Sequence, residues 1–167
     1  MRLINLFLMS FLMLLITGCV EDLNPERKDK RTALGKSANF ISTTTFNQNI
    51  DLSDELLTHD AVVLYFTMWC PICDGHMSHI RKEVMNNYPN VRFLMVDYVS
   101  GSLAQSKALQ RANGYTNLTV LVDNKQTLLN QFNATMATVV VINDQSNLLL
   151  NEDYKNGARL INVLNNI

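Results

Sequence analysis

The chain has few of the residues that mark specialised classes of protein, with only 3 Cys, 3 Pro and 6 Gly among 167 residues. Three cysteines are too few for a disulfide-stapled scaffold or for a zinc site made of cysteine alone, and so little Gly and Pro excludes collagen-like chains. Neither sign of charge is in excess, because 14 Lys and Arg stand against 15 Asp and Glu to give a net charge of −1. The basic surface typical of nucleic-acid binding is missing, so we expect no nucleic acid among the partners.

The apolar residues gather near the start of the chain. Leu3–Ile16 has only Asn5 and Ser10 as polar positions and follows a single basic residue, Arg2. A charged start followed by about a dozen apolar residues is typical of a secretory signal peptide, and the run is shorter than the ~20 residues of a spanning helix. We therefore assign residues 1–18 to a signal peptide.

The sequence Ile16-Thr17-Gly18-Cys19 at the end of this segment resembles the lipobox of bacterial lipoproteins, in which the cysteine is lipidated. Cleavage would make Cys19 the new N-terminus, and its acyl chains would hold the protein on a membrane outside the cytoplasm. Val20 differs from the Asp that is associated with inner-membrane retention, so in a Gram-negative cell we expect the outer membrane, facing the periplasm. Residues 19–38 are rich in charge and poor in large aliphatic side chains, which is typical of a flexible linker.

Residues 39–167 are expected to form one α/β domain, since a domain takes roughly 150 residues. Ala61–Phe66 is a continuous apolar run of strand length, so it predicts a strand that is buried on both faces. A helix over Cys70–Asn86 and a strand over Asn90–Val96 complete a βαβ unit. The other expected helices are Asp51–Leu57 with Ser53 as its cap, Ser102–Ala112, Asn124–Phe132 and Asn156–Asn165, and the other expected strands are Leu118–Val122, Thr138–Ile142 and Asn147–Leu150. This order predicts a mixed central sheet flanked by helices.

The sequence Trp69-Cys70-Pro71-Ile72-Cys73 lies directly after the first buried strand, at the start of a helix. Two cysteines at this spacing can close a small disulfide ring, and the positive end of the helix favours a thiolate at the first one. Cys70 is therefore the expected nucleophile, and Cys73 would attack the mixed disulfide that Cys70 forms with a partner. Pro71 suits the first helical turn because its missing N–H would be unpaired there.

Two structural thiols or a metal site are the alternatives to redox chemistry at this motif. His76 and His79 extend it to Cys-x2-Cys-x2-His-x2-His, but one helix cannot wrap four such side chains around one ion. We therefore expect no metal and no cofactor. Copper handling by Cys70, Cys73 and His76 stays open, although most of the methionines are better explained as core residues that fill gaps.

The segment Val62–Ile80 resembles the strand, Trp-Cys-Pro-x-Cys motif and following helix of the thioredoxin superfamily. The closest resemblance is to the membrane-tethered TlpA/ResA-type thiol–disulfide oxidoreductases, and it covers most of Asn39–Ile167. It implies a thioredoxin-like fold in which a strand and a helix over Leu118–Phe132 form the insertion of this group. It also implies that Cys70 attacks and Cys73 resolves, while Trp69 flanks the site.

Three features depart from the family pattern. Ala137 stands where the family has a cis-proline, so the resemblance implies that Met136 and Ala137 flank the cysteine pair. A cis bond before a residue other than proline costs ~2.5 to 4 kcal/mol, so we expect a trans bond there. Leu64 stands where thioredoxins carry a buried acid. His76 and Ser78 replace the Glu and Pro that commonly follow the motif.

His76 lies one helical turn beyond Cys73, so it is a candidate for lending positive charge or relaying a proton, with a solvent-facing residue as the alternative. His59 and His79 are interpreted as surface residues. The expected function is disulfide exchange with cysteine-containing envelope proteins, with reduction favoured and a membrane thiol electron donor required. A thioredoxin-fold binding or assembly module with weak redox activity is the competing hypothesis.

Overall fold

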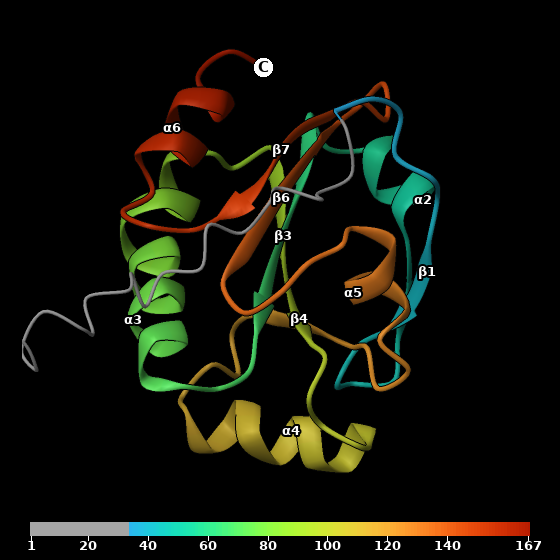
Figure 1. Cartoon of the computed structure of the whole chain (residues 1–167), viewed down its shortest axis with the longest axis vertical. Helices are drawn as coiled ribbons and strands as arrows, with labels where there is room; N and C mark the ends of the chain where they lie inside the picture. The colour runs from blue at the N-terminus through green and yellow to red at the C-terminus, as the bar shows by residue number, and fades with distance from the viewer. Residues whose placement is uncertain (1–33) are drawn as a thin grey trace, which may run out of the picture. The chain divides into compact units, whose positions relative to one another are not determined.

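The computed structural model describes residues 34–167 of the chain, and a five-stranded sheet lies at the centre of this part (Figure 1). The strand order is β5 (Thr119–Val122), β4 (Val91–Asp97), β3 (Ala61–Thr67), β6 (Thr138–Asn143) and β7 (Leu148–Asp153). β3, β4 and β5 are parallel, whereas β6 and β7 are antiparallel to their neighbours, so the predicted mixed sheet is confirmed. The predicted signal peptide and Cys19 lie outside the described residues.

Helices cover both faces of the sheet (Figure 1). One face carries α3 (Pro71–His79) and α6 (Ala158–Leu164), and the other carries α2 (Leu52–Leu56) and α5 (Thr127–Gln131). α4 (Leu103–Ala112) lies across the end of the sheet where β3 and β4 finish. The π-helical turn η1 (Ile80–Val84) and the 3₁₀ turn η2 (Met85–Asn87) extend α3. β1 (Ile41–Thr43) and β2 (Asn49–Asp51) form a separate antiparallel hairpin. None of the helices described within residues 34–167 is long and apolar enough to cross a bilayer.

Two helix starts differ from the sequence prediction because an aspartate supplies the cap. The Asp51 side chain, not Ser53, caps α2 by accepting a hydrogen bond from the backbone N–H of Ser53. Asp123 accepts hydrogen bonds from the N–H groups of Leu128 and Leu129, so α5 forms after residue 126 rather than at Asn124. Both carboxylates satisfy N–H groups that a helix start leaves unpaired.

Alternate residues of β3 belong to two separate apolar clusters. Val63 and Tyr65 pack in the cluster beneath α3 and α6, whereas Leu64 and Phe66 pack in the cluster beneath α2 and α5. All seven residues of β3 are buried, which confirms the prediction of a strand covered on both faces. The end of β3 is thus fixed from both sides, and the segment that follows it starts from a rigid point.

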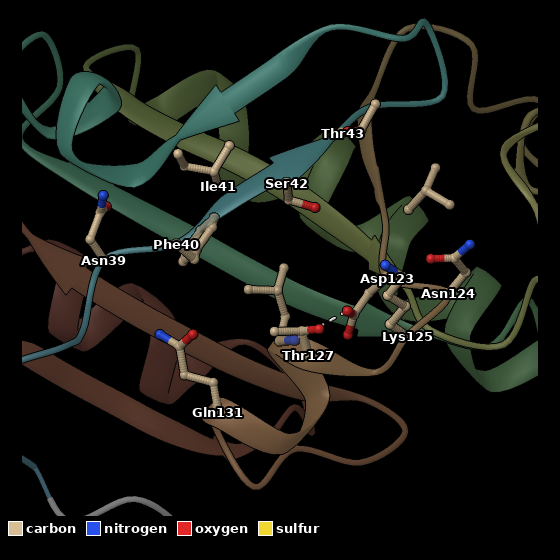
Figure 2. A pocket seen from close by; sticks show the side chains of 12 residues that line it. Asn39, Phe40, Ile41, Ser42, Thr43, Asp123, Asn124, Lys125, Thr127 and Gln131 are labelled. Atoms are coloured by element: carbon tan, nitrogen blue, oxygen red, sulfur yellow. Dashed lines mark hydrogen bonds between the residues drawn. The ribbon is translucent and has the colours of Figure 1, made fainter.

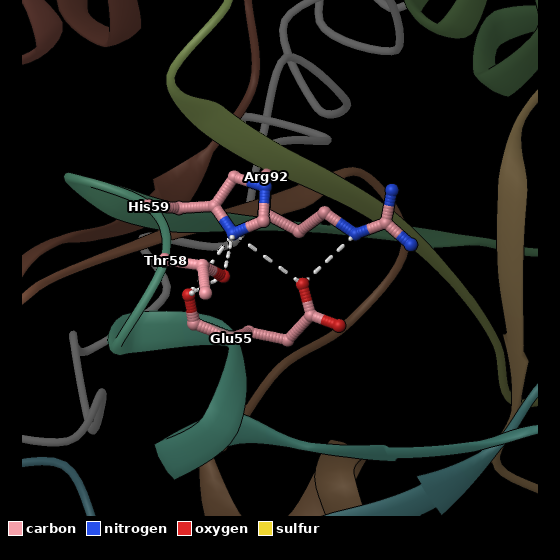
Figure 3. Close-up of polar contacts among 4 residues, drawn as sticks. All are labelled: Glu55, Thr58, His59 and Arg92. Atoms are coloured by element: carbon pink, nitrogen blue, oxygen red, sulfur yellow. Dashed lines mark hydrogen bonds and ion pairs between the residues drawn. The ribbon is translucent and has the colours of Figure 1, made fainter.

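A polar cluster at the other end of β3 involves His59 and corrects its assignment to the surface (Figure 3). His59 Nδ1 contacts the backbone carbonyl of Glu55 at 3.0 Å and the Glu55 carboxylate at 3.6 Å. The same carboxylate forms an ion pair with Arg92 of β4, at 3.1 Å between Nε and Oε2. The cluster therefore ties α2 to β4, and His59 is partly buried in a structural contact.

The residues just before Asn39 also pair with the sheet. Ser37 donates a backbone hydrogen bond to Ser146 at 2.7 Å, and Leu148 donates one to the carbonyl of Gly35 at 2.7 Å. Lys36 forms a bridge with Asn147 in the turn between β6 and β7. Ordered backbone contacts therefore begin at Gly35, a few residues ahead of the boundary expected from composition.

A tight turn over residues 135–138 leads into β6, at the place where the thioredoxin family has its cis-proline loop. The Met136–Ala137 bond is trans, as predicted, and Ala137 has a φ of 65°. The Ala137 N–H donates to the carbonyl of Phe66 at 2.9 Å, and its carbonyl accepts from the N–H of Tyr154 at 2.7 Å. These two bonds hold a left-handed alanine, a conformation that costs roughly 1–2 kcal/mol for a residue with a Cβ.

We predict that Ala137→Pro destabilises the fold by roughly 3 kcal/mol, because proline requires a φ near −65° and has no N–H to donate to Phe66. Chemical denaturation of the purified protein measures this free energy of unfolding. Ala137→Gly is the matched control, since glycine keeps the N–H and accepts a positive φ; its stability should stay within about 1 kcal/mol of the wild type. A proline variant as stable as the glycine variant would show that the turn is not fixed as described.

Candidate redox site

The cysteine pair lies where β3 passes into α3. Cys70 is the N-cap of α3, and its Sγ accepts a hydrogen bond from the N–H of Cys73 at 3.2 Å. Pro71 occupies the first helical turn, as predicted. Trp69 has a left-handed φ of 59°, and its N–H donates to the Thr67 hydroxyl at 3.2 Å. The sharp bend after β3 thus directs the first sulfur at unpaired N–H groups of the helix.

The two cysteines are free, and their Sγ atoms lie 2.7 Å apart. Cys70 is partly exposed, whereas Cys73 has a relative exposure of 0%. Because only one sulfur of the pair faces solvent, a partner can reach Cys70 but not Cys73. The separation is short enough for the pair to close a disulfide with a small adjustment of the side chains.

The two thiols have opposite pKa shifts. Partial burial acts to raise the pKa of Cys70, but hydrogen bonds from the Cys73 thiol and from backbone N–H groups outweigh it and lower that pKa. Burial raises the pKa of Cys73, and the hydrogen bond with Cys70 raises it further. The accessible sulfur is therefore the better thiolate of the two.

The turn over residues 135–138 lies against the pair. Met136 Sδ is 3.5 Å from Cys70 Sγ and accepts a hydrogen bond from that thiol. Met136 thus lies beside Cys70 and is only partly buried. Met68 and Ile72, on either side of Cys70 in the sequence, are exposed apolar side chains with relative exposures of 41% and 59%.

His76 is not a solvent-facing residue. Its Nδ1 lies 3.0 Å from the hydroxyl of Tyr65, and its ring packs at 4.9 Å, between centroids, from the ring of Tyr154. Burial lowers the pKa of His76, and nearby His79 lowers it further. The ring is therefore held neutral over a wider pH range than that of an exposed histidine.

His79 also differs from its assignment to the surface. Its Nδ1 lies 2.5 Å from the Tyr154 hydroxyl, and the side chain is partly buried. Nδ1 of each histidine is therefore directed at a tyrosine hydroxyl rather than at the sulfurs. Residues 34–167 contain no group of three or more His, Cys, Asp or Glu side chains that could hold a metal ion.

Trp69 flanks the pair, as the resemblance implies, and packs against the apolar cluster beneath α3 and α6. Its indole Nε1 is buried and has no hydrogen-bond partner among the described residues. Sequence reasoning missed Tyr65, whose fully buried side chain points into the same cluster directly beneath α3. The sequence does offer one indication of its role, because Tyr65 carries the one hydroxyl in the apolar run Ala61–Phe66. It also follows Leu64, the position where thioredoxins carry a buried acid.

A cavity of about 360 Å³ lies on the other side of the sheet, between β1 and α5 (Figure 2). Its wall includes Asp123, whose carboxylate is already bonded to the first turn of α5, and burial raises the pKa of Asp123. Neither Cys70 nor Cys73 lines it. The cysteine pair and this cavity are therefore separate features of the molecule.

No protein-family model matches the chain, and no curated protein matches it in sequence. Solved structures do match it. The exposed lipoprotein thioredoxin Etrx1 of Streptococcus pneumoniae is 25% identical, with coverage of 78% of this chain and 100% of that chain and a TM-score of 0.61. A Chlorobium tepidum protein assigned as the thiol:disulfide interchange protein DsbE is 16% identical, with coverage of 80% and 95% and a TM-score of 0.67.

A secreted disulfide oxidoreductase of Mycobacterium tuberculosis, described as homologous to DsbE, is 19% identical, covers 77% of this chain and 96% of its own, and has a TM-score of 0.59. The likeness extends over nearly the whole length of each of these three proteins. The chain therefore has a thioredoxin-like fold, of the kind found in TlpA/DsbE-type thiol–disulfide oxidoreductases.

Proposed function

We propose that this protein is a thiol–disulfide oxidoreductase in which Cys70 exchanges disulfides with other proteins. The observation that carries the proposal is the pair itself: two free thiols 2.7 Å apart, one accessible with a lowered pKa and the other buried with a raised pKa. Structural thiols have no need of this asymmetry. Disulfide exchange does, because it needs one thiolate that attacks and one thiol that waits.

In the reducing direction, the Cys70 thiolate attacks a sulfur of the partner disulfide. A Cys70–partner disulfide forms, and the partner's other cysteine leaves as a thiolate. Cys73 then gives up its proton and attacks Cys70 Sγ, which forms the Cys70–Cys73 disulfide and releases the partner's second thiolate. The reduced pair has lost two electrons and the partner has gained them.

The proposed partners are cysteine-containing proteins of the cell envelope, with a membrane thiol donor that returns the pair to the reduced state. The exposed side chains of Met68 and Ile72 beside Cys70 supply an apolar border against which a polypeptide can lie. The trans bond at Ala137 and the hydrogen bonds of its N–H and carbonyl leave that residue's backbone unable to pair with a partner strand. We infer a narrower range of protein substrates than a freely pairing loop would give.

Alkylation of the reduced protein should be strongly selective for Cys70. Because its pKa is lowered, the reactive thiolate persists as pH falls, and it is lost only when pH drops through that lowered pKa; Cys73 stays a thiol until pH rises above its own raised pKa. Peptide mass spectrometry after iodoacetamide treatment at several pH values measures both rates. Equal rates, or a Cys70 midpoint at or above the free value of about 8.5, would contradict the assignment of the nucleophile.

Cys73→Ser should trap partners as mixed disulfides through Cys70, because the step that releases them is lost. Affinity purification from cells without reductant, followed by elution with dithiothreitol, recovers the trapped proteins. Cys70→Ser/Cys73→Ser is the control and should recover none of them. A chelator present throughout excludes metal-bridged complexes, and recovery of the same proteins by the double variant would identify a binding module rather than an oxidoreductase.

The proposed location is outside the cytoplasm, on a membrane through lipid attached to Cys19. The lipobox supports this, as does the likeness to an exposed lipoprotein and to a secreted oxidoreductase. Cys19→Ser should leave the signal peptide uncleaved and should remove acyl chains from the protein. Membrane fractionation and intact-mass measurement test both effects, and a Cys19→Ser protein of wild-type mass and location would rule the anchor out.

A further inference from the structure

The buried hydroxyl of Tyr65 joins the resolving cysteine to a histidine. Tyr65 is in β3 and faces the cluster beneath α3, with a relative exposure of 0%. Its hydroxyl lies 3.0 Å from His76 Nδ1. Burial raises the pKa of Tyr65, and the Cys73 thiol is close enough to raise that pKa further. Cys73 and His76 are three residues apart, on one face of α3, so a single hydroxyl reaches both.

We propose that Tyr65 and His76 carry the proton that Cys73 must lose when it resolves a mixed disulfide; this inference rests on the proposed function. Cys73 has a raised pKa and is fully buried, so at neutral pH it needs a base in order to attack. Leu64, at the position where thioredoxins carry a buried acid, packs in the opposite cluster beneath α2 and α5. Tyr65, in contrast, faces the cluster beneath α3, and its hydroxyl contacts His76, a base one helical turn beyond Cys73.

The proton balance follows from the two contacts. As the Cys73 sulfur attacks Cys70 Sγ, its proton passes to the Tyr65 oxygen while the Tyr65 hydroxyl proton passes to His76 Nδ1. The partner leaves as a thiolate, the Cys70–Cys73 disulfide forms, and the histidine becomes a cation. Tyr65 stays neutral throughout, and the partly exposed imidazolium of His76 then returns the proton to water.

The surroundings keep this path defined. The ring of Tyr65 is fixed by edge contacts with Tyr154 at 5.9 Å and with His76 at 6.0 Å, measured between ring centroids. The other titratable groups that face the path are Cys70, His79 and Tyr154. His79 and Tyr154 bond to each other, and burial raises the pKa of Tyr154 to about 12, so Tyr154 stays protonated near neutral pH.

The reaction of the reduced protein with dithiobis-nitrobenzoate measures the attack by Cys70 and the resolution by Cys73 separately, because each step releases one coloured thiolate. The first coloured thiolate leaves when Cys70 attacks the reagent, and the second leaves when Cys73 attacks the resulting mixed disulfide. Tyr65→Phe removes the hydroxyl and keeps the ring. Stopped-flow absorbance should show an unchanged first release and a second release slowed by roughly tenfold or more near neutral pH. The deficit should shrink as pH rises toward the pKa of Cys73, a trend that a loss of packing would not produce.

His76→Gln keeps a polar side chain at the partly exposed end of the path and tests the relay even if Tyr65→Phe folds poorly. It should slow the second release alone, and the double variant should be no slower than the slower single variant, because both changes break one path. Tyr154→Phe is the matched control, since it removes the neighbouring hydroxyl that bonds to His79 rather than to Cys73; its second release should match the wild type.

A second release at the wild-type rate in both single variants, or additive losses in the double variant, would overturn the relay. These outcomes differ from failure of the proposed function. If the wild-type protein gives no second release, or if Cys73→Ser gives one, the pair does not perform the exchange at all. If the wild-type protein completes both releases but the variants do not slow the second one, the relay is wrong and the oxidoreductase assignment still holds.

Discussion

The hydrogen bond from the N–H of Cys73 to Cys70 Sγ is the contact on which the chemistry of this molecule depends. It exists because β3 is buried on both faces and ends at a fixed point, after which a short bend places Cys70 at the cap of α3. The sulfur occupies the position that a Ser or Asp oxygen usually fills at a helix start. The same bond that begins the helix therefore stabilises negative charge on the accessible sulfur, so helix formation and thiolate formation support each other.

Two residues beside Cys70 are held in left-handed conformations that side chains rarely adopt. Trp69 precedes Cys70 with a φ of 59°, and Ala137 follows Met136, which contacts Cys70, with a φ of 65°. Each conformation costs roughly 1–2 kcal/mol, and in each case a backbone N–H bonded to the end of β3 offsets part of the cost. Such residues cluster at functional sites because the surrounding contacts must over-determine the geometry there. Here they set the bend before the nucleophile and the close approach of Met136.

The elements of the fold were largely predictable, because continuous apolar runs and capped helices leave strong patterns. The strand at Ala61 and the helix at Pro71 were placed within a residue or two, and their order implied the parallel pairing of β3 with β4. Helix starts were less predictable, since Asp51 and Asp123 compete with neighbouring cap residues through geometry that a linear pattern does not carry. The cysteine pair was identified from its spacing and from its place between a buried strand and a helix start. The role of Tyr65 was not predicted, because it depends on a contact with His76 of α3, which lies 11 residues away in the sequence.

A tyrosine suits this buried position in a way that a carboxylate would not. A neutral hydroxyl with two hydrogen-bond partners costs far less to bury in an apolar strand than a charge does, and it can accept one proton while it donates another. Burial raises the pKa of Tyr65, so it remains protonated and passes a proton on without itself ionising. The lowest pH at which the relay works is then set by His76. Its lowered pKa keeps the ring neutral and able to accept a proton at pH values below the ordinary histidine range, and the relay closes only when pH falls through that lowered value. The proposed relay would thus keep the resolving step active under mildly acidic conditions.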